Sequence, residues 1–209
     1  GSPQRTLEVS VVLPESGLTR TYLGERVEDT FPLLWAEGDK VSLNGVASSP
    51  VSASDAGKRA CPFIFRGSVK APFNILYPAT EHSDKVVFPM VQNYTADSFD
   101  PAAFPMYASC NEYTDATMRH LGTLLGFQFT ATDGIESSLK QLIVMSIDGN
   151  TLSGTFNLEK DENGGFTGDF AGAEGATTAT LDFPEGGLAL SEVPVTAWIS
   201  VPAGEYPKG

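Results

Sequence analysis

Cysteine and histidine are scarce in this sequence of 209 residues, which contains two of each. Cys61 and Cys110 form no Cys-x-x-Cys pair, and His82 and His120 form no His-x-x-x-His or His-Glu-x-x-His pattern. We therefore expect no metal centre and no cofactor. The cysteine spacing leaves two readings open: a disulfide that closes a loop of about 50 residues, or two buried thiols.

Basic residues are also few. The chain has 13 Lys and Arg against 26 Asp and Glu, so its formal net charge is −13. We expect no nucleic-acid partner, because phosphate contacts need clustered Lys and Arg. The apolar runs are only a few residues long, whereas a membrane-spanning helix needs about 20. No signal peptide opens the sequence, and we expect residues 1–4 to be an expression tag or disordered.

The common catalytic motifs are missing as well. Gly122 and Gly126 lack the following Lys-Ser/Thr of a phosphate-binding loop, so they are better explained by packing or a bulge in a strand. No Gly-x-Ser-x-Gly elbow is present. Residues 161–164 resemble the start of a calcium loop but lack its alternating ligands and closing glutamate. Carboxylates are so abundant that a glycosidase-like pair would arise by chance. We expect a protein that is not an enzyme.

Hydrophobic residues make up 41% of the chain, and 21 Gly and 14 Pro divide it into short segments. Alternation with period two dominates, which is typical of strands. Asn44-Gly45 predicts a tight hairpin turn, and Asp148-Gly149-Asn150 predicts a hairpin between its flanking strands. The predicted strands are 7–13, 19–27, 31–35, 40–43, 124–131, 139–147, 151–158, 177–183 and 193–201. Of these, 139–147 is the most apolar and is expected to be central.

Two short helices are predicted, at 97–104 and 115–121. In the first, Asp100 precedes a proline at the expected first helical position. The stretches 46–58 and 168–175 are expected to be loops. Many short strands without a βαβ rhythm predict an all-β fold, a Greek-key β-sandwich with one or two short helices, in a single domain spanning 1–209. A closed barrel is the alternative.

Aromatic residues gather between Cys61 and Tyr113. Tyr94, Tyr107 and Tyr113 are candidate ligand or partner contacts, because aromatic faces stack on sugar rings and tyrosines anchor interfaces. The competing interpretation is that these rings, with Phe99 and Phe104, fix an irregular segment to the core. The residues 93–95 also match the N-glycosylation sequon, a motif that often arises by chance.

The order of several motifs resembles fimbrillin-like proteins, which are surface lipoproteins of gut and oral anaerobes. The resemblance spans nearly the whole chain, and it rests on the order of degenerate motifs. They are, in sequence, Thr19-Arg20-Thr21, Leu34-Trp35-x-x-Gly38-Asp39-Lys40-Val41-Ser42-Leu43, Tyr77-Pro78-Ala79, Phe88-Pro89-x-x-Gln92, Pro105-Met106-Tyr107-Ala108, His120-Leu121-Gly122-Thr123-Leu124-Leu125 and the ending Val201-Pro202-Ala203-Gly204-Glu205-Tyr206-Pro207-Lys208-Gly209.

The resemblance implies a transthyretin-like β-sandwich at the cell surface or outer membrane, held there by a lipid anchor outside this chain. It implies work in a fimbrium or pilus, or in cell adhesion, with other pilus subunits or surface proteins as partners. In polymerising members, cleavage at an arginine removes an N-terminal strand, and a strand of a neighbouring subunit fills the groove. Arg20 and Arg26 are the candidate processing sites. Residues 202–209 are expected to lead into a further C-terminal domain.

These considerations predict a fimbrial subunit or adhesin-like protein without enzymatic activity. The alternative is a carbohydrate-binding surface module that uses the tyrosine-rich segment, with glycans as its ligands.

Overall fold

A computed structural model describes residues 5–14, 19–22, 25–28, 33–112, 115–132, 134, 136–204 and 206. Within these residues the protein is nearly all β, with one short 3₁₀ helix, η1 (Pro101–Ala103). The strands are β1 (Thr6–Val12), β2 (Thr19–Tyr22), β3 (Glu25–Glu28), β4 (Ser42–Leu43), β5 (Val46–Ala47), β6 (Ala60–Arg66), β7 (Phe73–Tyr77), β8 (Lys85–Phe88), β9 (Val91–Asn93), β10 (Met106–Cys110), β11 (Ala116–Thr117), β12 (Arg119–His120), β13 (Gly122–Phe129), β14 (Ser137–Leu139), β15 (Gln141–Met145), β16 (Ser153–Lys160), β17 (Phe166–Ala176), β18 (Thr178–Asp182), β19 (Leu188–Leu190) and β20 (Val195–Pro202).

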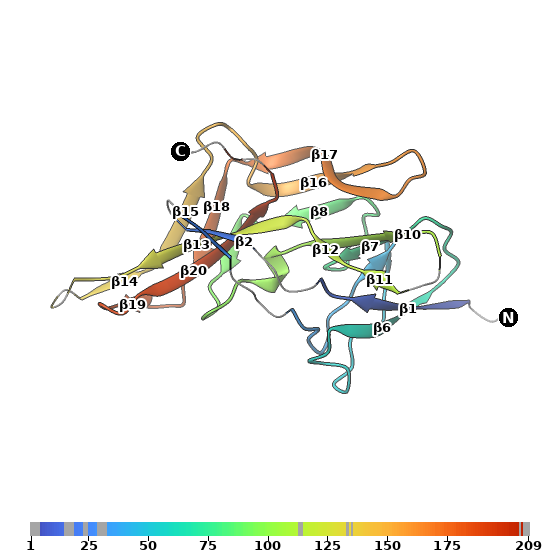
Figure 1. The fold of residues 1–209 in the computed structure, drawn as a ribbon, viewed down its shortest axis with the longest axis horizontal. Helices are drawn as coiled ribbons and strands as arrows, with labels where there is room; N and C mark the ends of the chain where they lie inside the picture. The colour runs from blue at the N-terminus through green and yellow to red at the C-terminus, as the bar shows by residue number, and fades with distance from the viewer. Residues whose placement is uncertain are drawn as a thin grey trace.

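Two sheets form the end of the molecule that contains β1, on the right of Figure 1. Their strand orders are β11-β1-β6 and β12-β10-β7-β4-β5. Alternate residues of these strands point inward and form one apolar cluster, since successive side chains of a strand face opposite sides. The largest fully buried members of this cluster are Trp35, Phe63, Phe65, Leu43, Ile75 and Met118.

The opposite end contains the sheets β20-β13-β2-β3 and β15-β18-β9, and the pair β14-β19 continues from it (Figure 1). A second apolar cluster lies there, built from β13, β15, β18 and β20. A sheet β17-β16-β8 lies above the middle of the molecule in this view. Phe88, Phe156 and Phe170 fill its inner face with rings 5.0–6.1 Å apart.

The all-β class is confirmed, and several sheets pack around shared apolar clusters as a sandwich does. The Greek-key connection, the transthyretin-like topology and the single domain stay predictions. Among the described residues, no helix is long and apolar enough to span a membrane.

Several local predictions are confirmed. The strand at 7–13 is β1, and 124–131, 177–183 and 193–201 overlap β13, β18 and β20. Asn44 and Gly45 have φ angles of 48° and 84° and join β4 to β5 as the predicted hairpin turn. The first predicted helix is the turn η1, where the Asp100 side chain accepts a hydrogen bond from the Ala102 amide.

Other predictions are wrong because strand pairing with distant segments decided the structure there, and the local sequence pattern does not reveal such pairing. The segment 19–27 is a pair of antiparallel strands, β2 and β3, and Trp35 lies outside any strand. The predicted helix 115–121 is replaced by β11 and β12, which pair with β1 and β10. Residues 29–32, which include the start of the strand expected at 31–35, are outside the described residues.

The region after residue 139 contains the largest errors. β15 and β16 do not form the hairpin expected across residues 148–150, because β15 pairs with β18 and β16 pairs with β17 and β8. The stretch 168–175 is not a loop, because it lies within the long strand β17. β15 is an edge strand rather than a central one. Its apolar composition indicated burial, but three of its five side chains are exposed.

Candidate functional site: the groove that holds the N-terminal strand

The strand β1 lies in a groove between β6 and β11. It pairs with β6 in antiparallel register along its whole length, from Thr6 opposite Arg66 to Val12 opposite Ala60. On its other side, its last two residues pair in parallel with β11. Backbone hydrogen bonds continue the contact at the C-terminal end, where the Leu13 amide donates to Arg59 and the Met118 amide donates to Val12.

Alternation along β1 supplies the contact with the core. Val9, Val11 and Leu13 are at most 4% exposed, and Glu8 on the opposite face is exposed. Each fully buried aliphatic side chain stabilises the fold by about 1.5–3 kcal/mol. The floor of the groove is the buried apolar cluster that these side chains enter, and Cys61 and Phe63 of β6 lie beside Val11 and Val9 in the sheet as members of the same cluster.

Trp35 contacts β1 from the side of the core. Its indole Nε1 donates a hydrogen bond of 3.1 Å to the Val11 carbonyl, and its ring meets Phe63 edge-on with centroids 5.0 Å apart. The ring of Tyr77 meets the other side of the indole at 5.6 Å. Burial, followed by the nearby negative charge of Asp39, raises the pKa of Tyr77. The sequence pattern predicted Trp35 in a strand but gave no sign of this contact, because the partner lies 24 residues away.

The two candidate processing sites lie just after β1, in the hairpin of β2 and β3. Arg20 pairs with Val27 on one side and with Leu124 of β13 on the other. Among the described residues, Arg26 pairs only with Thr21, because β3 is the last strand of the sheet β20-β13-β2-β3. A protease binds its substrate as an extended strand, and an outer strand offers a free side for this pairing. The backbone therefore favours Arg26 over Arg20 as the site of cleavage.

The three candidate contact tyrosines do not form one surface. Tyr94 is half-buried, with its ring 5.0 Å from that of Phe183, and burial raises its pKa. Tyr107 is only 7% exposed, and Tyr113 lies outside the described residues. Among the residues whose side-chain exposure the structure describes, Tyr206 is the one exposed aromatic residue, and these residues contain no exposed aromatic platform for a sugar ring.

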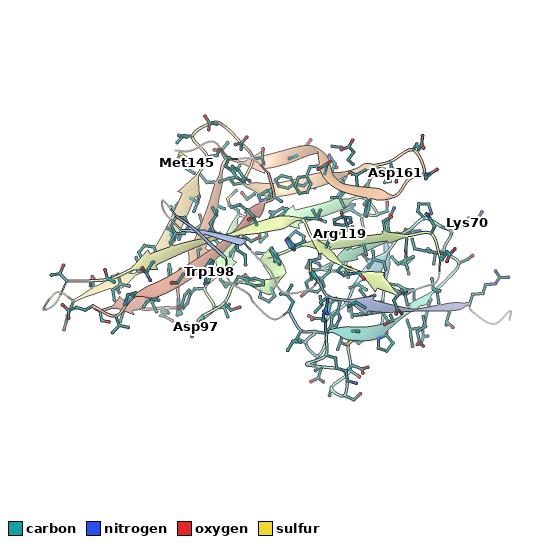
Figure 2. The ribbon with its side chains drawn as sticks, viewed as in Figure 1. Lys70, Asp97, Arg119, Met145, Asp161 and Trp198 are labelled. Atoms are coloured by element: carbon teal, nitrogen blue, oxygen red, sulfur yellow. The ribbon has the colours of Figure 1, made fainter. Side chains whose placement is uncertain are left out.

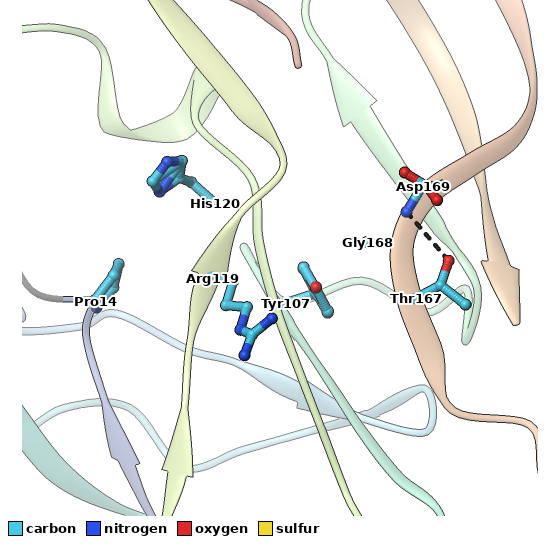
Figure 3. A pocket seen from close by; sticks show the side chains of 7 residues that line it. All are labelled: Pro14, Tyr107, Arg119, His120, Thr167, Gly168 and Asp169. Carbon is cyan, nitrogen blue, oxygen red and sulfur yellow. Dashed lines mark hydrogen bonds between the residues drawn. The ribbon is translucent and has the colours of Figure 1, made fainter. Parts of the chain in front are cut away.

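Tyr107 instead contributes to a pocket of about 390 Å³ that Figure 3 shows from close by. Its lining comes from several elements: Pro14, Tyr107, Arg119, His120, Thr167, Gly168 and Asp169. A dashed line in the figure marks the hydrogen bond of 3.2 Å that the Asp169 amide donates to Thr167. A β-carbon at position 168 would overlap the Tyr107 hydroxyl group, so glycine is needed there.

Among the described residues, no hydrogen bond joins the polar side chains Arg119, His120 and Asp169 of this pocket into a catalytic group. The ring of His120 stacks on Phe104 with centroids 5.6 Å apart, and loss of solvent there lowers the pKa of the imidazole. Asp169 and Arg119 come from different strands, β17 and β12.

The cysteines resolve one question that the sequence left open. Cys61 and Cys110 are both free. The Cys61 thiol is buried against the Asp55 carbonyl, and burial raises the pKa of both thiols, which makes them poor nucleophiles. The described residues contain no group of three or more His, Cys, Asp or Glu arranged to hold a metal ion.

Comparison of the chain with protein-family models, with curated proteins and with solved structures finds no match to any of the three.

Proposed function

We propose that this chain is a non-enzymatic fimbrial subunit or adhesin-like protein of the cell surface that assembles by β-strand addition. The observation that carries the proposal is the position of β1, which precedes both Arg20 and Arg26 and fills an apolar groove between β6 and β11. The order of motifs that resembles fimbrillin-like proteins supports the same proposal.

Cleavage after Arg26 would separate β1 from the rest of the chain. The trimmed protein would keep β6 and β11 with an open ladder of hydrogen-bonding groups between them. It would also keep the apolar floor that Val9, Val11 and Leu13 now cover. A strand with apolar residues at the same alternate positions fits this groove, and a neighbouring subunit is the source that the proposal requires.

The test is digestion of the intact protein with an arginine-specific protease, followed by size-exclusion chromatography with light scattering. We expect a product that lacks residues 1–26 and elutes as oligomers. A synthetic peptide of residues 6–13 should inhibit the assembly when added in excess, because it occupies the same groove.

Arg26→Lys and Arg20→Lys are matched controls, since both keep the positive charge and remove one cleavage site. Arg26→Lys should prevent both trimming and assembly by strand addition, whereas Arg20→Lys should change neither. A trimmed chain that stays folded and monomeric under all conditions would show that the proposal is wrong.

A further inference from the structure

The strand β15 is an unprotected edge at the end of the molecule opposite β1 (Figure 1). Its only ladder among the described residues is with β18, from Gln141 opposite Asp182 to Met145 opposite Thr178. Leu142 and Val144 face the apolar cluster between the sheets. Ile143 and Met145 face outward, 57% and 65% exposed, and Met145 is labelled in the upper left part of the molecule in Figure 2.

Edge strands of natural proteins normally carry features that prevent pairing with another chain, such as charges, proline or bulges. Other edge strands here carry them, including Pro62 in β6, Lys85 in β8 and Glu174 in β17. The segment 141–147 carries no charge, proline or glycine, although the chain as a whole has a net charge of −13. Its register with β18 is also free of bulges.

The sequence around β15 is complementary to itself in antiparallel orientation. Two copies centred on Val144 place Ile143 of each opposite Met145 of the other, on the outer face. The same register places Lys140 of each copy near Asp148 of the other, at both ends of the pairing. Both of these charged side chains are exposed. Opposite charges thus flank an uncharged apolar strand in a symmetric pattern.

We infer that the intact protein forms a twofold symmetric dimer through antiparallel pairing of β15 with β15 of a second copy. The sheet β15-β18-β9 then continues across the axis, which lies at Val144. On the outer face, Val91, Thr180 and Ile143 already lie in one row across the sheet. Pairing extends this row to Met145 of the second copy and reduces the exposure of both apolar side chains.

The dimer requires no proteolysis and uses a different edge from β1, so it goes beyond the proposed assembly by strand addition. The test is sedimentation equilibrium of the intact, uncleaved protein near physiological salt. We expect a reversible monomer–dimer equilibrium. Ile143→Lys places a charge on the edge without disturbing the core and should leave only monomer. Val193→Lys, at a residue 70% exposed outside any strand, should leave dimerisation unchanged.

The flanking charges provide a second, independent test. Lys140→Asp puts like charges together at both ends of the pairing and should weaken dimerisation by about tenfold. Adding Asp148→Lys to this variant restores opposite charges in reversed order and should recover the affinity.

An intact protein that stays monomeric up to millimolar concentration would overturn the inference, as would a dimer that Ile143→Lys leaves intact. Failure of the two proposals is distinguishable, because the Arg26→Lys chain cannot be trimmed at that site and should still dimerise through β15.

Discussion

Gly126 lies directly opposite Trp198 in the ladder of β13 and β20, and the indole covers the space that a side chain would occupy. Trp198 is 3% exposed and packs with Phe99, Phe104 and Leu124. An aromatic ring over a cross-strand glycine compensates for the packing that glycine lacks. The sequence-based interpretation of this glycine as a packing residue agrees with the contact, although its partner could not be known.

Replacing Gly126 by Ala should therefore destabilise the protein. The added methyl group overlaps the Trp198 ring, and relief of such overpacking costs about 1–3 kcal/mol. Urea denaturation should show a lower free energy of unfolding. Gly204→Ala is the matched control, because no described atom beyond its chain neighbours lies within 4 Å of a β-carbon there, and its stability should stay close to that of the parent chain.

Gln92 of β9 is a buried polar side chain that links its strand to β20, with which β9 forms no ladder among the described residues. It is fully buried, and its amide binds the backbone of Ser200 twice, donating to the carbonyl at 2.7 Å and accepting from the amide at 2.9 Å. The Ser200 hydroxyl group is itself buried without a hydrogen-bond partner among the described residues. The two residues therefore contribute oppositely to stability although they touch.

Gln92→Ala should destabilise the fold by about 2–5 kcal/mol, because it leaves two buried backbone groups unsatisfied and creates a cavity. Ser200→Ala removes an unsatisfied hydroxyl group and should be neutral or slightly stabilising. Thermal or urea denaturation of both variants measures the difference. Equal losses of stability in both variants would contradict this account of the hydrogen bonds.

At the scale of elements, β1 depends on a side chain outside any strand. The Trp35 indole reaches the Val11 carbonyl and also packs on Phe63. The interaction joins the segment after the β2–β3 hairpin to the N-terminal strand, so it determines how firmly β1 is held in its groove. The proposed strand addition requires that β1 be held strongly enough to protect the core and weakly enough to leave after cleavage.

Trp35→Phe should loosen β1 specifically. The variant keeps an aromatic ring and loses a hydrogen bond worth about 0.5–1.5 kcal/mol. Hydrogen exchange should become faster in the amides of residues 7–13. Tyr77→Phe is the control: it loses a hydrogen bond of 3.4 Å to Asp39 from the same aromatic group, and exchange in β1 should stay unchanged. Equal acceleration in both variants would contradict a specific role for the indole.

Strand positions were largely predictable, but strand pairing was not. Alternation identified β1 and β13, because a half-buried strand must present every second residue to the core. It also located β20, although the last six residues of that strand are buried on both faces. The same local signal gave no information about partners. It therefore missed that β15 and β16 belong to different sheets, although a turn joins them. It also overlooked β17, whose glycines and alanines look like a loop until β16 pairs with them.

At the scale of the whole molecule, charge is the dominant surface property. The net charge of −13 is spread over exposed side chains, which favours solubility but adds repulsion within the folded state. Some local pairs offset it, such as Lys58 with Asp55 at 3.0 Å. Exposed pairs of this kind contribute at most about 1 kcal/mol.

Raising sodium chloride from low to physiological concentration should therefore raise the melting temperature, because salt screens the repulsion. Differential scanning calorimetry at two salt concentrations measures the effect. Glu174→Lys with Glu185→Lys exchanges two negative for two positive charges, which changes the net charge from −13 to −9. This variant should show a smaller salt effect, and an equal or larger effect would contradict the argument.

The sequence by itself determined the fold class of this protein. Period-two alternation, frequent turns and an acidic composition are sufficient for an all-β fold with a solvated surface, because they act through neighbouring residues and total charge. The turn at Asn44-Gly45 and the cap at Asp100 were equally local. Only the tertiary structure decided which strands are edges and which side chains meet. The groove of β1 and the exposed edge at β15 depend on strand pairing between segments far apart in the chain. The hydrogen bonds of Trp35 and Gln92 likewise join distant residues. No local pattern encodes such contacts, since they are selected by the joint packing of several strands around one core.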